Sequence, residues 1–215
     1  MTTRRGMREA RRLRSRRIRA VLASGLVFGV GAAMTLAAWN DSEHTNATFT
    51  AGRFGIVGAV DGVTFSEHPA APGATLNFAV APAAMVPGTT TYALFSVRTT
   101  PSSVAGNLQL SASATPGGTG LAAHLTYGVR VIPAATAPAA TTCNSATYNA
   151  ATDPTAVVVP AGSALTTGAT ASRPISANGG ATVNYCFAVT LPITAPNAAQ
   201  GLTMSQTWQI LGTAS

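Results

Sequence analysis

Four residues of the types that catalyse hydrolysis lie side by side near the N-terminus: Asp41, Ser42, Glu43 and His44. Consecutive side chains of an extended chain point to alternate sides, so these four cannot converge as the members of a Ser–His–Asp triad do. No G-x-S-x-G turn surrounds the serine, and nothing places the two acids in the cleft that a carboxylate pair needs. We interpret this stretch as a solvated polar spacer and not as an active site.

The three histidines, His44, His68 and His124, do not form a zinc-binding motif. No two of them have the spacing of HExxH or of a His-x₃₋₅-His pair. His124 begins a strand-like stretch, and His68 follows Glu67 in a turn, where a metal ion would need ligands from distant parts of the chain. We therefore expect no catalytic residue, no metal ligand and no cofactor, which makes an enzyme the less favoured class.

The charged residues are unevenly distributed. Nine of the thirteen basic residues lie within the first nineteen positions: Arg4, Arg5, Arg8, Arg11, Arg12, Arg14, Arg16, Arg17 and Arg19. After Trp39, four arginines (Arg53, Arg98, Arg130, Arg173) face five acids (Asp41, Glu43, Asp61, Glu67, Asp153), and 4 − 5 gives −1. Nucleic-acid binding is excluded for this part, because it depends on many basic contacts to phosphates. The chain has no lysine, which also excludes a P-loop and lysine-based covalent chemistry.

The N-terminal segment has the organisation of an export signal. Residues 1–19 are Arg-rich and residues 20–38 are apolar, which are the n-region and h-region of a signal peptide, and small residues stand at its end. We predict cleavage by a signal peptidase at the end of the apolar run, where Ala37 and Ala38 supply the small residue that precedes the cut. The alternative is an uncleaved anchor, since about twenty apolar residues can span a bilayer. In either case the rest of the chain is exported to the extracellular side of a bacterial envelope, and it meets the membrane only through this segment.

The remainder of the chain reads as strands separated by turns. Residues 39–53 are predicted to be an extended segment, and residues 54–215 a single domain. Candidate strands occupy 54–60, 75–80, 90–98, 106–112, 124–132, 155–160, 182–191 and 202–211, with Pro-Gly and Asn-Gly turns between them. No helical periodicity follows residue 40. The predicted fold is all-β, an antiparallel β-sandwich of jelly-roll or immunoglobulin-like type, preceded by a signal-peptide helix.

Two cysteines are present, and we predict that Cys143 and Cys186 form a disulfide, as suits an exported protein. Free or metal-bound thiols are the alternative. Cys186 lies on the outward face of its strand if the Tyr185 and Phe187 face is the core. Cys143 lies in an Ala/Thr/Pro-rich stretch, 133–153, that we interpret as a long surface excursion.

The stretches TLAAWND (35–41) and ATFTAG (47–52) together resemble the SipW-type signal-peptide junction of the TasA/camelysin family, and MVPGT (85–89) is similar to a family element before a strand. The resemblance implies an exported surface or matrix protein with a jelly-roll-like fold. Some members form biofilm fibres in which an N-terminal segment completes the sheet of a neighbour. Carried over, a dedicated signal peptidase would cut between Ala38 and Trp39. The donor would be the released Trp39 end and residues 46–56, a segment that includes Asn46, Phe49, Phe54 and Ile56. The sequence departs from the family at Arg53, where an acidic residue is usual.

Three functions remain as hypotheses. The first is an exported structural protein of the cell surface or extracellular matrix that associates with itself or with sister proteins. The second is a secreted peptidase of the camelysin type, although no zinc motif is present. The third is a secreted carbohydrate- or ligand-binding module, in which exposed aromatic residues such as Trp39 or Tyr148 would contact the ligand.

Overall fold

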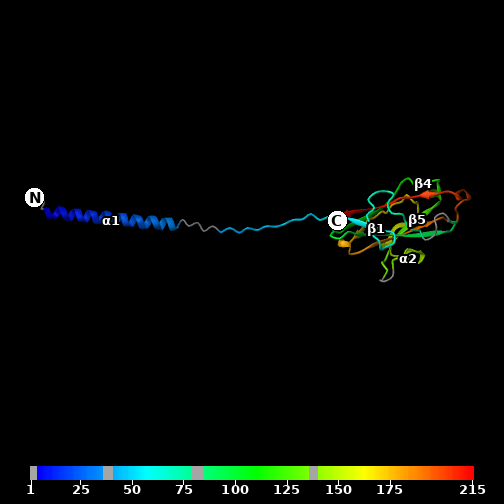
Figure 1. The fold of residues 1–215 in the computed structure, drawn as a ribbon, viewed down its shortest axis with the longest axis horizontal. Helices are drawn as coiled ribbons and strands as arrows, with labels where there is room; N and C mark the ends of the chain where they lie inside the picture. Colours follow the sequence, from blue (N-terminus) through cyan, green and yellow to red (C-terminus); the bar gives the residue numbers. More distant parts are fainter. Residues whose placement is uncertain (1–3, 36–40, 79–84, 136–139) are drawn as a thin grey trace. The chain divides into compact units, whose positions relative to one another are not determined.

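The computed structural model describes residues 4–35, 41–78, 85–135 and 140–215. The chain divides into two units, Met1–Phe49 and Thr50–Ser215, so that the folded unit begins slightly before the predicted boundary at residue 54. In the first unit, helix α1 (Arg4–Thr35) covers most of the Arg-rich and the apolar segment (Figure 1). The predicted cleavage position, Ala38 and Trp39, lies outside the described residues. Among the helices that are described, none combines the length and the apolar character that crossing a bilayer requires.

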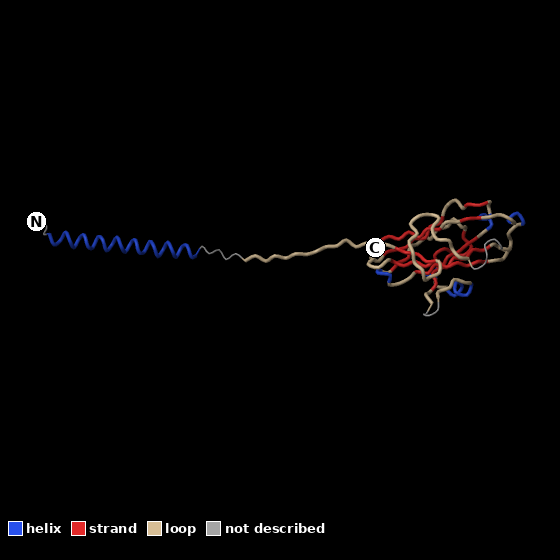
Figure 2. Tube along the Cα trace, viewed as in Figure 1, coloured by secondary structure: helices blue, strands red, loops and turns tan. Residues whose placement is uncertain are grey.

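The second unit consists mainly of strands, as Figure 2 shows. They are β1 (Ile56–Ala59), β2 (Thr90–Thr99), β3 (Gly106–Ala112), β4 (Gly117–Gly118), β5 (Thr126–Ile132), β6 (Val157–Ser163), β7 (Arg173–Ile175), β8 (Val183–Thr190), β9 (Met204–Ser205) and β10 (Trp208–Ala214). Helix α2 (Ser145–Ala150) and the 3₁₀ turns Leu121–His124, Pro154–Ala156, Ala177–Gly179 and Asn197–Ala199 connect them. The prediction of an all-β fold is confirmed.

The strands form three antiparallel sheets. A five-stranded sheet has the order β1-β2-β8-β5-β6, a three-stranded sheet the order β10-β3-β7, and β4 pairs with β9. Strand β8 comes late in the chain but lies between two early strands. Its residue Phe187 is opposite Ala93 of β2 on one side and Val129 of β5 on the other.

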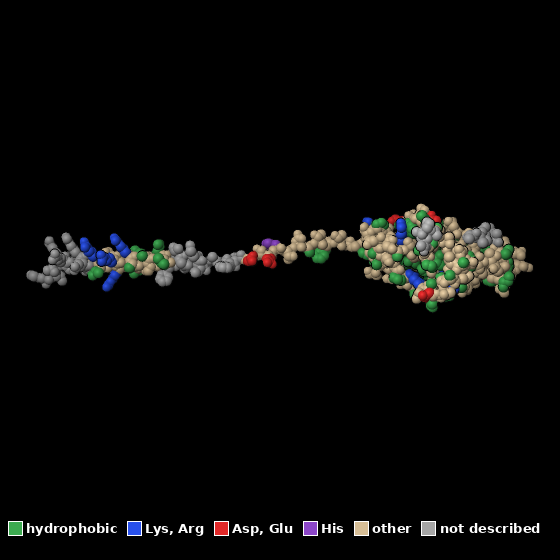
Figure 3. Space-filling view, turned by 90° about the horizontal axis from the view of Figure 1, so that it is seen from below, with side chains coloured by type: hydrophobic (Ala, Val, Ile, Leu, Met, Phe, Trp, Pro, Cys, Tyr) green, Lys and Arg blue, Asp and Glu red, His purple; other side chains and the backbone are tan. Residues whose placement is uncertain are grey.

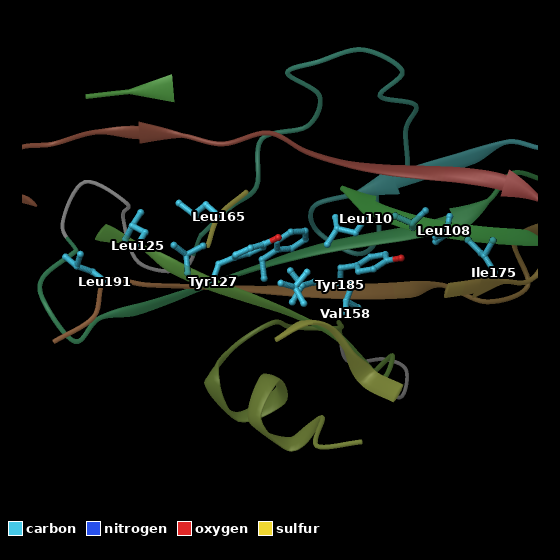
Figure 4. Close-up of a cluster of buried hydrophobic side chains, with 14 residues drawn as sticks. Leu108, Leu110, Leu125, Tyr127, Val158, Leu165, Ile175, Tyr185 and Leu191 are labelled. Carbon is cyan, nitrogen blue, oxygen red and sulfur yellow. The ribbon is translucent and has the colours of Figure 1, made fainter. Parts of the chain in front are cut away.

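The core takes side chains from both of the larger sheets. Tyr127, Tyr185 and Phe187 of the five-stranded sheet and Leu108 and Leu110 of the three-stranded sheet are almost fully buried in the same cluster. Figure 4 shows this cluster, with Leu108 and Leu110 lying above Tyr185. The alternation predicted for 182–191 is the cause, because every second residue of β8 points to this cluster.

The opposite face of β8 is also buried, which the sequence did not predict. Cys186 and Ala188 belong to a second cluster with Tyr148 and Ala151, whose segment covers this face. Residues 145–150 form a helix that starts at a capping box, in which Asn144 and Thr147 bond to each other's backbone. The prediction of no helix after residue 40 is therefore wrong. Most described residues of 133–153 are exposed, while Tyr148 and Ala151 are buried against the sheet.

Some predicted strands differ from the structure. Residues 75–78 have no regular secondary structure, and positions 79 and 80 lie outside the described residues. The single strand predicted at 202–211 is divided into β9 and β10, since the Gln206 side chain at the interruption donates to the carbonyls of Ser113 and Thr207. The two-residue β4 and the three-residue β7 were not predicted, because such short strands carry no measurable periodicity.

Candidate functional site

An extended N-terminal segment, residues 41–52, carries the clearest unsatisfied hydrogen-bonding capacity of the described chain. All twelve residues are exposed, and none of their backbone groups makes a hydrogen bond to another described residue. Asn46 and Phe49, two of the predicted donor residues, lie here, and the Phe49 side chain is 92% exposed. Phe49 is the one large apolar side chain of this segment.

The other two predicted donor residues, Phe54 and Ile56, belong to the folded unit. Ile56 is the first residue of β1 and lies opposite Thr99 of β2. The Phe54 ring packs against Gly106 of β3 and Gly212 of β10. A Cβ atom added at Gly106 would lie only 2.5 Å from this ring, and one added at Gly212 only 2.7 Å, so both positions need glycine. The structure therefore separates the predicted donor into an unpaired part before residue 53 and a part that is bound within its own unit.

Three of the four outer edges of the two larger sheets are protected. Strand β6 contains Pro160 and pairs irregularly with β5, and β7 is only three residues long and contains Pro174. Strand β1 is covered by Ser66, which exchanges two backbone hydrogen bonds of 2.9 Å with Gly58. Proline, irregular pairing, shortness and a covering loop are the usual means by which sheet edges avoid further pairing.

Among the described residues, the fourth edge, β10, has none of these protections. Its seven residues, WQILGTA, contain no proline and no charge and pair without interruption with β3. At either end of this ladder, the Ser113 N–H donates to the Thr207 carbonyl and the Ser215 N–H to the Ala105 carbonyl. These two bonds show that the odd-numbered residues of β10 are the ones that bond to β3. Because bonding alternates along an antiparallel strand, the backbone groups of residues 208, 210, 212 and 214 point away from β3. In the described part of the chain they have no partner.

An apolar groove with a volume of about 1210 Å³ lies beside this edge. Its lining comes from β1, β2, β3, β8, β9 and β10 and from the loop after β1, and includes Phe54, Phe78, Phe95, Phe187, Trp208 and Ile210. The groove thus follows the line along which the β10 edge approaches β1 and β2. We call this line the open seam.

The opposite line, between β7 and β6, is closed. The Arg173 guanidinium of β7 donates a 2.7 Å hydrogen bond from Nη2 to the carbonyl of Val157 in β6. Ile175 and Val158 are buried in the common core next to it. We call this line the closed seam.

The predicted disulfide is present. Cys143 and Cys186 are bonded, with their Cα atoms 5.3 Å apart. The bond ties the segment around α2 to the face of β8 opposite the common core, where Arg130 stacks on Tyr148 with its Cζ atom 4.6 Å from the ring centre. Such a bond is typical of a non-reducing compartment. Tyr148 is only 4% exposed, so the prediction that it is available to a ligand is wrong, and Trp39 lies outside the described residues.

The candidate catalytic residues are not brought together. Asp41, Ser42, Glu43 and His44 follow one another on exposed extended chain. His68 contacts the Ser66 hydroxyl, 3.2 Å from its Nε2, and His124 ends a 3₁₀ turn. Within the described residues, no three side chains of His, Cys, Asp or Glu could together hold a metal ion.

The two carboxyl groups with a lowered pKa, those of Asp61 and Asp153, accept hydrogen bonds within local turns. The Thr64 hydroxyl, followed by the N–H groups of Val63 and Thr64, lowers the pKa of Asp61 to about 2. The hydroxyl and N–H of Thr155 lower the pKa of Asp153 in the same way. Both carboxylates are exposed and cap local turns, so these shifts indicate local structure and not catalysis.

No protein-family model matches the chain, and no curated protein matches it either.

Proposed function

We propose that this protein is an exported, non-catalytic structural protein of the bacterial cell surface or extracellular matrix that self-associates by N-terminal strand addition. One observation carries the proposal. The twelve residues 41–52 have no backbone partner among the described residues, while the folded unit has a sheet edge that also lacks one there. Strand addition satisfies both sets of groups at once.

Export is supported by two independent features. Helix α1 joins nine arginines to an apolar run, as a signal peptide of residues 1–38 would, with cleavage between Ala38 and Trp39. The disulfide between Cys143 and Cys186 requires an oxidising environment to form and persist. Both features favour a protein that works outside the cytoplasm.

The architecture that fits best is a jelly-roll-like β-sandwich. The chain crosses from the five-stranded to the three-stranded sheet and back several times, and β8 returns to lie between β2 and β5. A late strand that returns beside an early one is a Greek-key connection, and jelly rolls combine two of them. This architecture is also what the resemblance to the TasA/camelysin family implies.

The charge distribution favours association. Residues 50–215 carry four arginines and three acids, so their formal charge is 4 − 3, or +1. On the face shown in Figure 3, the surface of the folded unit is mostly uncharged. Copies of a nearly neutral domain repel each other little, which removes one barrier to self-association.

The test is to replace residues 41–52 of the full chain by a flexible Gly/Ser segment of equal length. We expect the exported protein to remain folded and to lose its assemblies, as seen by electron microscopy and sedimentation. A matched control replaces only residues 41–43, which contain none of the predicted donor residues, and should assemble normally. Assemblies that survive the first replacement, or an unaltered protein that stays monomeric at every concentration, would contradict the proposal.

The groove favours a second candidate, a binding module for apolar small molecules. Its volume of about 1210 Å³ exceeds that of a typical small-molecule site, and its lining is largely aromatic and aliphatic. Saturable binding of a fluorescent fatty-acid probe at one molecule per chain, lost on Ile210→Glu, would support this candidate over self-association.

A further inference from the structure

We infer that the β10 edge and the groove of the open seam receive residues 44–52 of a second copy as an added strand, with Phe49 buried in the groove. The inference rests on the proposed function and names the receiving site. It follows from a comparison of the four sheet edges, of which β10 alone lacks proline, irregular pairing, a covering loop and extreme shortness in the described chain.

The backbone of β10 offers a regular series of outward groups. The N–H and C=O groups of Ile210 and Gly212 face away from β3, with those of Trp208 and Ala214 on either side. An incoming strand that bonds to these groups would extend the three-stranded sheet by one member. The segment 44–52 is long enough to follow all seven residues of β10.

The sequence of the incoming segment has two different faces. Positions 47, 49 and 51 are Ala, Phe and Ala, and they alternate with Asn, Thr and Thr at 46, 48 and 50, so that one side is apolar and the other polar. The same alternation exists in β10, where Ile210 packs on the core and Leu211 is 55% exposed. An added strand in register with this alternation places its apolar face toward the groove.

Phe49 is the residue that distinguishes the two faces of the segment. It is 92% exposed in its own chain, and the small alanines two positions away on either side leave room for its ring to enter a cavity. Phe54 already occupies the end of β10 at Gly212, so the free part of the groove lies toward Trp208 and Ile210. The two phenylalanines then fill successive positions along one seam.

Association of this kind is head-to-tail, because the donor segment and the receiving edge are different surfaces of one chain. A symmetric pairing of two β10 strands would satisfy the same backbone groups but would leave both the groove and Phe49 unfilled. A head-to-tail contact that does not close on itself produces a filament. With a second copy of this chain as the partner, the product is therefore a linear assembly.

The experiment uses two substitution sets in the full exported chain. Phe49→Ser removes the anchor of the donor. Leu211→Lys with Ala214→Pro places a charge on the receiving strand and removes one outward N–H, and both residues are exposed. Val63→Ser and Ile193→Lys are the controls, since these residues are 69% and 78% exposed and lie elsewhere. Circular dichroism and thermal unfolding verify that each variant is folded.

We expect Phe49→Ser to weaken association by about tenfold or more, the value that follows from losing the burial of one Phe side chain. The β10 set should weaken it at least as much, because it removes one outward N–H and adds a charge to the receiving strand. The controls assemble as the unaltered chain does. When the two defective variants are mixed, the intact donor of one meets the intact edge of the other. The mixture should therefore form heterodimers, measured by sedimentation, that do not grow into filaments.

The possible results separate the inference from the proposed function. Normal assembly of Phe49→Ser would overturn the burial of Phe49 in the groove and so the inference, whereas the replacement of residues 41–52 decides on strand donation itself. Loss of assembly with Phe49→Ser but not with Leu211→Lys and Ala214→Pro would leave the proposed function standing and overturn the β10 edge as the receiver. Dimers of Phe49→Ser that vanish with the β10 substitutions would show symmetric β10 pairing. Protection of the β10 amides in a monomer would show the segment folding back on its own chain. Either of these also overturns the inference.

Discussion

The two seams of the folded unit lie between the same two sheets but differ in how their edge strands are protected. At the closed seam, β6 and β7 carry Pro160 and Pro174, and Arg173 links the strands by a hydrogen bond to the Val157 carbonyl. At the open seam, β10 presents a regular uncharged edge beside a groove of about 1210 Å³. Unprotected sheet edges are a general hazard, and β10 is the edge of the two larger sheets that lacks protection among the described residues, which is why we propose that it receives a partner.

The covalent bond of the unit also lies away from the open seam. The connection from β5 to β6 contains Cys143, which is bonded to Cys186 on the face of β8 that is turned away from the common core. This covalent bond therefore constrains the face of β8 that is turned away from the groove. The following predictions test this division, beginning with the largest effect.

Removal of the disulfide should cause the largest loss of stability. Cys143→Ala with Cys186→Ala opens a loop with a sequence separation of 43 residues. The chain-entropy relation gives a loss of about 4 kcal/mol in the free energy of unfolding. Urea unfolding of the double variant and of the unaltered chain, under the same non-reducing conditions, measures the difference.

Reduction provides the control for this variant. The unaltered chain unfolded in the presence of a reductant should lose about as much stability as the double variant, which itself should not respond to the reductant. Equal stability of the double variant and the oxidised unaltered chain would show that the bond does not stabilise this side of the molecule, and would remove one difference between the seams.

Alkaline pH should have the next largest effect. Burial raises the pKa of Tyr127, Tyr148 and Tyr185, which lie on β5, α2 and β8. A raised folded-state pKa gives stability that is complete below the unfolded value near 10 and is lost as the pH rises from there through the folded value. For each such tyrosine the loss approaches about 1.4 kcal/mol per pH unit in that interval.

Tyr185→Phe makes this prediction specific. The Tyr185 hydroxyl is buried and has no hydrogen-bond partner among the described residues, so its removal leaves no group unpaired. We expect little change at pH 7 and a smaller loss of stability above pH 10, measured by urea unfolding across the pH range. An unchanged alkaline slope would contradict the assignment.

Breaking the hydrogen bond of the closed seam should have a moderate effect. Arg173→Met removes the donor to the Val157 carbonyl and keeps much of the apolar side chain. A hydrogen bond from a charged group contributes about 1.5–3 kcal/mol, and partial exposure of Arg173 favours the lower end. Urea unfolding measures the loss.

A second arginine serves as the control for Arg173. The guanidinium of Arg98 stacks on Phe65, with its Cζ atom 4.0 Å from the ring centre, and such an exposed contact contributes about 0.5 kcal/mol. Arg98→Met should therefore cost less than Arg173→Met. Equal losses in the two variants would mean that the bond to Val157 does not hold the closed seam together.

The smallest effect on stability should come from removing an edge protection. Pro160→Thr restores an N–H to the exposed edge of β6. We expect the free energy of unfolding to change by less than about 0.5 kcal/mol, as for most surface substitutions. Light scattering should nevertheless show new association that does not require residues 41–52. No added association would mean that Pro160 does not protect this edge.

The sequence predicted the strands best where alternation was long. The stretch 182–191 revealed the core face of β8 through Tyr185, Phe187 and Val189, and the disulfide followed from two cysteines in a chain expected to be exported. Prediction failed where tertiary contacts decide the structure. Tyr148 looks like a loop residue in its Ala/Thr-rich surroundings, yet it is buried against Arg130 and the sheet.

That β10 is an unprotected sheet edge could be predicted only in part. The absence of proline and charge from residues 208–214 is visible in the sequence, but strand order is not. Only the sheet order shows that β10 is an edge, and only the groove shows that apolar side chains could enter beside it. Phe49 could be found from its alternation with small and polar residues, because that pattern is local.

Amide hydrogen exchange along β10 tests the central claim most directly. The N–H groups of Gln209 and Leu211 point to β3, whereas those of Ile210 and Gly212 point outward. In the assembled protein, exchange at Ile210 and Gly212 should slow by about tenfold or more, toward the rates of their neighbours. In Phe49→Ser it should remain fast. Assemblies in which Ile210 and Gly212 exchange as rapidly as in the monomer would contradict the account.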